Sequence, residues 1–130
     1  MQDVIIGALR TYFATHDSDI DVAYLFGSTA RGTARAGSDV DVAVLPGGSA
    51  RGPLDALRLE LEGDIERTLG RPVQLVVLDR APADLVHRVL RDGVLLYERD
   101  RARRIAFEVR ARNEYFDLQP FYARYRRQVS

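Results

Sequence analysis

The sequence contains no cysteine and no lysine, and it has no long hydrophobic run. The absence of cysteine excludes a disulfide framework and any metal site built from thiolates. No hydrophobic run approaches the ~20 residues that a membrane-spanning helix needs. The N-terminus also lacks the basic segment and long apolar core of a signal peptide. We therefore expect a cytoplasmic protein that does not associate with membranes.

The 130 residues are enough for one domain with an ordinary core, and the hydrophobic share of 46% is typical of soluble globular proteins. All 19 basic residues are arginine, for which genome composition is a sufficient explanation. Residues 1–98 hold 10 arginines and 15 acidic residues, whereas residues 99–130 hold 9 arginines and 4 acidic residues. We expect a core over 1–98 and a helical tail over 99–130, rich in arginine and aromatic residues, within one domain. The tail is typical of a surface for a protein partner, although arginine stems covering apolar surface would also explain it.

Two hydrophobic runs flank the most informative stretch of the chain. The first, residues 20–26, ends in Gly27-Ser28, and ten residues later Asp39-Val40-Asp41 opens the second, residues 39–45. Both runs have the length and composition of buried strands. Because side chains alternate along a strand, Asp39 and Asp41 should share one face.

Each side of this stretch suits one part of a metal-assisted phosphoryl-transfer site. Neighbouring carboxylates repel each other and bind a hard cation such as Mg²⁺, which keeps water and substrate phosphates as its other ligands. Gly27 lets the backbone approach a ligand, and Ser28 is placed to cap the N-terminus of a short helix that faces an anion. Arg31 is expected to bind phosphate as well. Arg35 suits phosphate binding and a solvated loop equally.

The remaining pattern alternates helices and strands and predicts an α/β fold with one mixed sheet. Helices are expected over residues 3–15, from Pro53 to 69, and from Pro82 to Gly93, and strands over 73–78 and 94–97. Asp100 should cap a final helix through residue 117, which Pro120 should interrupt.

Gly-Ser, ten residues and then Asp-Val-Asp resembles the signature of the polymerase-β-like nucleotidyltransferases. Residues 30–32 (ARG) and 38–41 (SDVD) resemble its minimal branch, the MNT domains, and the resemblance continues through residues 71–79 (RPVQLVVLD), 90–100 (LRDGVLLYERD) and 114–120 (EYFDLQP). It implies a sheet of about four strands with helices packed on one face and the site at an edge of the sheet.

The resemblance also implies a function. MNT proteins act as antitoxins paired with HEPN-type ribonuclease toxins, and some silence the toxin by transferring AMP from ATP to a tyrosine. Asp39 and Asp41 would then be the catalytic residues that hold Mg²⁺ or Mn²⁺, and Gly27, Ser28 and Arg31 would bind the nucleotide. Because no second helical domain is evident, we expect the acceptor on a HEPN partner in a hetero-oligomer, without direct binding of nucleic acid.

One position departs from the family pattern. The third carboxylate of these enzymes usually lies in a strand that matches residues 73–76, where this chain has Gln74. Glutamine offers a carbonyl oxygen but no charge and no base, and Asp79 should face the opposite side of the strand. The chain is therefore either a weakened adenylyltransferase or a non-catalytic antitoxin that acts by binding alone. An antibiotic-modifying enzyme is disfavoured by the missing acceptor domain.

Overall fold

The computed structural model describes residues 1–16, 19–48 and 54–129 of the chain, without the side chains of 122 and 127–129. Its elements, in chain order, are α1 (Gln2–Thr15), β1 (Ile20–Phe26), α2 (Gly27–Arg31), β2 (Val40–Pro46), α3 (Leu54–Leu69), β3 (Val73–Val77), the 3₁₀ turn η1 (Leu78–Arg80), α4 (Ala83–Asp92), β4 (Val94–Glu98) and α5 (Arg101–Val129). The expected helices and strands are thus confirmed, with small shifts at their ends. The expected helix start at Pro53 lies outside the described residues. Among the described residues, no helix is both long and apolar enough to cross a membrane.

The four strands form one mixed sheet, as expected from the sequence, and their order is β3-β2-β1-β4. β1 runs antiparallel to both β2 and β4, whereas β3 runs parallel to β2. The two central strands, β1 and β2, are almost entirely buried. Central strands that are apolar along both faces require cover on both sides.

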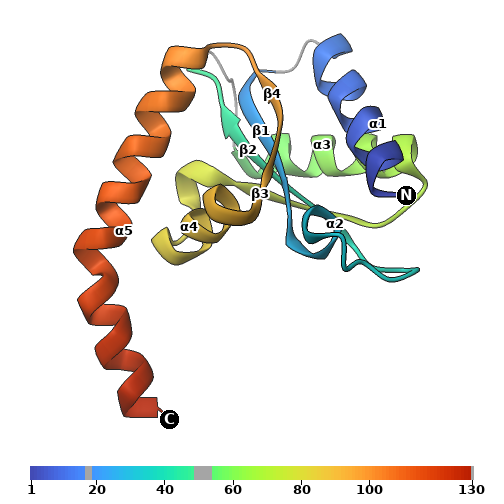
Figure 1. Cartoon of the computed structure of the whole chain (residues 1–130). Helices are drawn as coiled ribbons and strands as arrows, with labels where there is room; N and C mark the ends of the chain where they lie inside the picture. Colours follow the sequence, from blue (N-terminus) through green and yellow to red (C-terminus); the bar gives the residue numbers. More distant parts are fainter. Residues whose placement is uncertain (17–18, 49–53, 130) are drawn as a thin grey trace.

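Helices cover both faces of the sheet, so the expectation of helices on one face was wrong. Figure 1 shows α1 and α3 on one side of the sheet and α4 and α5 on the other. The first core includes Leu9 of α1 and Ile65 of α3, and the second includes Val89 of α4 and Phe107 of α5. The physical reason is that alternate residues of β1 and β2 are apolar on both faces, and each face is buried by its own helices.

Charged side chains cap both edges of the sheet. On the β3 edge, the backbone N–H groups of Val73 and Leu75 donate to the carboxylates of Glu66 and Glu62 on α3, each at 3.0 Å. On the β4 edge, the Arg10 guanidinium donates to the Leu95 carbonyl oxygen at 3.1 Å. These contacts occupy edge groups that could otherwise pair with another strand.

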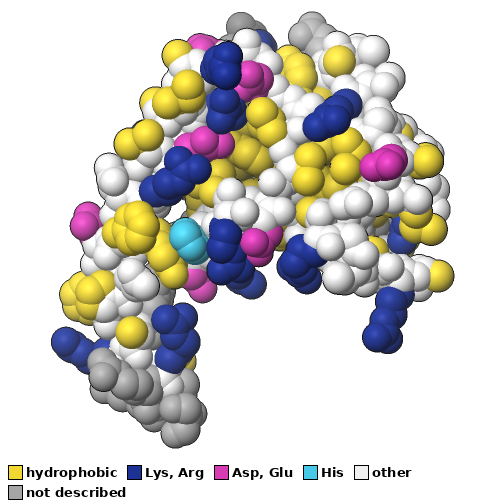
Figure 2. All heavy atoms as spheres, viewed as in Figure 1, with side chains coloured by type: hydrophobic (Ala, Val, Ile, Leu, Met, Phe, Trp, Pro, Cys, Tyr) yellow, Lys and Arg dark blue, Asp and Glu magenta, His cyan; other side chains and the backbone are white. Residues whose placement is uncertain are grey.

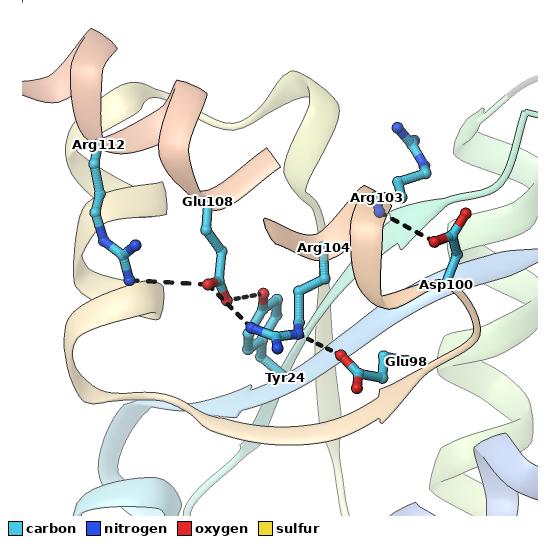
Figure 3. Close-up of polar contacts among 7 residues, drawn as sticks. All are labelled: Tyr24, Glu98, Asp100, Arg103, Arg104, Glu108 and Arg112. Carbon is cyan, nitrogen blue, oxygen red and sulfur yellow. Dashed lines mark hydrogen bonds and ion pairs between the residues drawn. The ribbon is translucent and has the colours of Figure 1, made fainter. Parts of the chain in front are cut away.

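The first half of α5 is attached to the sheet by a polar network (Figure 3). The Tyr24 hydroxyl of β1 donates to Glu108 at 2.7 Å, and Arg104 pairs with both Glu98 and Glu108. Burial, followed by the bond to Glu108, raises the pKa of Tyr24 well above its usual value. Tyr24 therefore remains a neutral hydrogen-bond donor in this network.

α5 begins as expected but does not end as expected. The Asp100 carboxylate accepts a bond from the backbone N–H of Arg103 at 3.2 Å, which confirms the N-terminal cap. The helix then continues past Pro120 to Val129, so the expected interruption was wrong. Proline removes one backbone bond and costs ~3 kcal/mol in a helix interior. Pro120 is solvent-exposed, where water can bind the carbonyl group that loses its partner.

A second attachment of α5 lies at the opposite end of β1 from Gly27. The Asp21 side chain is only 12% exposed and forms ion pairs with Arg99, at 3.2 Å, and with Arg103. Arg103 also donates to the Pro46 carbonyl oxygen at 2.9 Å, which joins α5 to the end of β2. A buried carboxylate with two arginine partners thus joins the ends of three strands to α5.

Asp21→Asn should destabilise the fold by about 1–2 kcal/mol, because it removes a charge-assisted pairing from a buried site whose arginine partners are partly solvated. Urea unfolding followed by circular dichroism measures the change. Asp55→Asn is the matched control, since it breaks an exposed pair with Arg80 at 3.6 Å and should cost less than ~0.5 kcal/mol. Equal effects of the two substitutions would contradict the assigned role of Asp21.

Candidate functional site

The Gly-Ser stretch and the second aspartate line one pocket of about 370 Å³. The pocket lies between the end of β1, α2, the start of β2 and α4, and it is lined by Phe26, Gly27, Ser28, Arg31, Asp41, Leu85, Arg88, Arg91 and Asp92. In Figure 2, basic side chains gather near the lower rim of this face, in the region of α2 and α4. The structure therefore brings together four of the five residues assigned to nucleotide and metal binding from the sequence.

Gly27 is required by the local geometry. Its φ is +73°, a conformation that favours glycine, and a Cβ atom at this position would lie 2.2 Å from Oδ2 of Asp41. Antiparallel pairing of β1 and β2 sets Phe26 opposite Asp41, which explains the close approach. Any side chain at position 27 would displace the carboxylate.

Ser28 lies inside the first turn of α2, so its expected role as the N-terminal cap was wrong. Phe26 is the capping residue, and it makes no side-chain bond to the helix. The helix starts two residues earlier than expected because Gly27, with its positive φ, turns the chain directly at the end of β1. Ser28 is half-buried and still lines the pocket.

The two aspartates differ in their environments. β2 begins at Val40, so Asp39 precedes the strand and is exposed, whereas Asp41 is half-buried in the pocket. Burial raises the pKa of the Asp41 carboxyl, the negative charge of Asp39 raises it further, and Arg31 lowers it. The ionised form of Asp41 is therefore disfavoured in the folded chain until a positive charge compensates it.

Gln74 is the lateral neighbour of Asp41. The parallel register of β2 and β3 pairs Asp41 with Gln74, and paired residues of neighbouring strands point to the same face of the sheet. From the family resemblance we expected position 74 to lie beside the two aspartates, and this register agrees with that expectation for Asp41. Asp79 belongs to η1 after the end of β3 and does not line the pocket.

The carboxylates of Asp39 and Asp41 suit a hard divalent cation whose remaining ligands come from water and substrate. No group of three histidine, cysteine or acidic side chains that could hold a metal occurs among the residues that the structure describes. The two carboxylates, Asp39 and Asp41, are the oxygen donors that Mg²⁺ prefers, and Mg²⁺ commonly binds one or two carboxylates together with substrate phosphates. The pKa of the Asp41 carboxyl is raised, so a bound cation would stabilise its ionised form.

Three charged residues of the pocket were not found from the sequence: Arg88, Arg91 and Asp92 of α4. Gly93 allows α4 to reach this position, because a Cβ atom there would lie 2.3 Å from the Val89 carbonyl oxygen and 3.1 Å from that of Leu25 on β1. The only signal in the sequence is the spacing of Leu85, Arg88 and Asp92, which places them along one side of a helix. Arg35, whose role was left open, is exposed and does not line the pocket.

Comparison with known proteins agrees with this geometry. A family model described as polymerase beta nucleotidyltransferase matches residues 8–102. A crystal structure of a toxin–antitoxin with AMP-PNP is 28% identical, with 98% of this chain and 97% of that chain covered and a TM-score of 0.76. A variant of the toxin–antitoxin MntA-HpeT with two aspartate-to-glutamate substitutions is 26% identical, with 99% and 98% covered and a TM-score of 0.77. No curated protein sequence matches the chain.

A third solved structure shares the fold. It contains a tri-AMPylated HEPN toxin from Shewanella oneidensis in complex with an MNT antitoxin, and it is 24% identical, with 99% and 98% covered and a TM-score of 0.74. The similarity to these structures extends over nearly the whole chain, including α5. Since the family model also covers well over half of the residues, the protein belongs to the polymerase beta nucleotidyltransferase family.

Proposed function

We propose that this chain binds ATP with a divalent metal ion in the pocket described above. It then transfers AMP to the hydroxyl group of a tyrosine on a HEPN-type toxin. The observation that carries the proposal is the contact between Gly27 and Asp41, which joins a phosphate-binding turn to a metal-binding carboxylate. The toxin–antitoxin crystallised with AMP-PNP, an ATP analogue, supports both the nucleotide and the partner. The protein would act as an antitoxin in the cytoplasm, where ATP is available.

The proposed reaction breaks a phosphoanhydride bond of ATP and forms a phosphate ester on the acceptor. The acceptor oxygen forms a bond to the α-phosphorus of ATP, the bond from that phosphorus to the β-phosphate oxygen breaks, and pyrophosphate leaves. The hydroxyl proton passes to solvent. Gly27 and Ser28 would hold the phosphates by their backbone N–H groups, and Arg31 would offset the negative charge.

Asp39 and Asp41 would hold Mg²⁺ or Mn²⁺, which when bound supplies charge neutralisation for the phosphates and activation of the acceptor hydroxyl. The half-buried position of Asp41 strengthens its interaction with a cation, because burial lowers the local dielectric constant. Gly27 leaves the space in which the Asp41 carboxylate sits. These contacts hold one carboxylate in place beside the phosphate-binding turn.

A second candidate function is neutralisation of the toxin by binding alone. The observation that favours it is Gln74, which lies beside Asp41 on the same face and carries no charge. Loss of one group that stabilises a transition state commonly costs ~10²–10³ in rate. A chain with this substitution could retain nucleotide binding while its turnover becomes slow.

We also propose that the region from Arg99 to the end of α5 provides the main partner contact. The first half of α5 packs on the sheet, whereas Phe116, Phe121 and Tyr125 are each 60% exposed or more. Figure 1 shows the C-terminal half of α5 extending away from the rest of the chain. Exposed aromatic residues beside arginine are typical of interface anchors. The side chain of Tyr122, which belongs to the same aromatic group in sequence, lies outside the described residues.

Asp41→Asn tests the metal site through stability. Since the folded-state pKa of Asp41 is raised, its contribution to stability is present below the ordinary value of 3.8 and is lost as the pH rises through the folded-state pKa. In EDTA the variant should therefore have a higher Tm than wild type at neutral pH, and the difference should disappear in acid. Wild type should gain about 2.7 kcal/mol from Mg²⁺ and ATP at a hundred times Kd, and the variant should not. Equal gains in both would rule out the assignment of Asp41.

Gln74→Asp tests whether this position weakens catalysis. An aspartate would restore the third carboxylate, so transfer of labelled AMP to the co-purified toxin should rise by up to ~10²-fold. Without metal the same variant should be less stable than wild type, because three carboxylates then share one site, and Mg²⁺ should reverse the loss. Gln74→Asn is the matched control and should give neither effect. Fast transfer by wild type that the aspartate does not improve would contradict this role of Gln74.

Deletion of residues 120–130 tests the partner surface. The shortened chain keeps the anchored part of α5, so it should fold and bind ATP as wild type does. Its affinity for the co-expressed toxin should fall by at least about tenfold, because loss of one aromatic anchor costs ~2 kcal/mol or more. Size-exclusion chromatography and titration calorimetry measure the two properties. An unchanged complex would place the interface elsewhere.

A further inference from the structure

The α4 side of the pocket carries more positive charge than the sequence motif accounts for. Arg88 and Arg91 come from α4 and line the same pocket as Arg31, whereas Asp41 and Asp92 are the acidic residues that line it. Asp41 is assigned to the metal in the proposed function. The remaining lining charges are three arginines against one carboxylate, a balance that suits an anion with several charges.

The three arginines differ in what they bind within the chain. Arg91 is paired with Asp92 through two bonds, at 2.8 and 3.0 Å, so its charge is already compensated. Arg31 lines the same pocket as Asp41, and its positive charge opposes the burial and the Asp39 charge that raise the pKa of the Asp41 carboxyl. Arg88 has no ion pair and no side-chain hydrogen bond to any residue of the described ranges 1–16, 19–48 and 54–129. Its five N–H donors therefore remain available on the wall of the pocket.

The surroundings of Arg88 favour a phosphate ligand. Leu85 lies one turn before it on α4, and with Phe26 it forms the apolar part of the pocket lining. Arg88 itself is exposed to solvent on the pocket wall, so its guanidinium group is accessible to an anion that enters the pocket. The planar fork of arginine matches phosphate oxygens in two parallel hydrogen bonds.

We infer that Arg88 is a phosphate-binding residue of this pocket, supplied by α4 in addition to Gly27, Ser28 and Arg31 of the motif. The inference rests on the proposed function for the identity of the anion, the triphosphate of ATP. The geometry by itself points to a polyphosphate group of any origin. Arg88 would position the phosphates. Because Arg88 belongs to α4, the affinity for the nucleotide would then depend on the position of this helix.

Arg88→Ala and Arg88→Lys in the full-length chain test the inference, with ATP and Mg²⁺ as one probe and inorganic tripolyphosphate as the other, both by titration calorimetry. Arg88→Ala should weaken both probes by about tenfold, the effect of losing one charge-assisted hydrogen bond. Arg88→Lys should weaken them less, because lysine keeps the charge and loses the fork. The matched control is Arg80→Ala, which removes the same charge from an exposed arginine outside this pocket and should leave both affinities unchanged. Circular dichroism confirms that each variant is folded.

The two probes separate this inference from the proposed function. Tripolyphosphate binding that depends on Arg88, without any binding of ATP, would support the phosphate site and overturn the nucleotide. Binding of ATP that Arg88→Ala leaves intact would overturn the role of Arg88 and leave the proposed function standing. Equal losses in Arg88→Ala and Arg80→Ala would also overturn it, since they would reflect overall charge. Absence of binding for both probes in wild type would overturn both proposals.

Discussion

The contact between the Asp41 carboxylate and the backbone of Gly27 is the constraint on which the site depends. The space that a Cβ atom would need at position 27 is taken by Oδ2 of Asp41, at 2.2 Å. Antiparallel pairing of Phe26 with Asp41 sets the distance between the two strands at this point. The turn at Gly27-Ser28 and the carboxylate are thus parts of one unit, formed by β1, α2, the connecting loop and β2. Since β1 and β2 are the central strands, the rest of the fold packs around this unit.

The helices α4 and α5 form the layer that covers one face of the sheet, a structural role that the charge pattern of residues 99–130 does not indicate. α4 and α5 lie on the same face of the sheet as Asp41, and they are joined by the stacked rings of His87 and Tyr115 at 3.7 Å. The anchored half of α5 holds this layer through Tyr24 and Asp21 of β1. The first half of the arginine-rich tail thus anchors the helix layer to the sheet, and its second half carries exposed aromatic residues.

Much of the site could be predicted from the sequence because the motif is local. Gly27 and Asp41 are separated by one short loop. The family resemblance pointed to Gln74, and the observed register pairs this residue with Asp41. The expected cap at Ser28 was wrong by two residues, since the positive φ of Gly27 starts the helix earlier. The interruption at Pro120 failed because the penalty for proline in a helix is finite, and a solvated, exposed helix tolerates it.

The sequence by itself determined the strands, the motif that joins two of them and the family resemblance, because these depend on spacing along the chain. Only the tertiary structure decided which helices cover which face, that α4 lies against α2, and that Arg88 and the Arg91–Asp92 pair enter the pocket. No periodicity encodes those contacts. They follow from packing between segments far apart in the chain, where apolar burial on both faces of the sheet and the close approach of α4 to β1 at Gly93 set the arrangement.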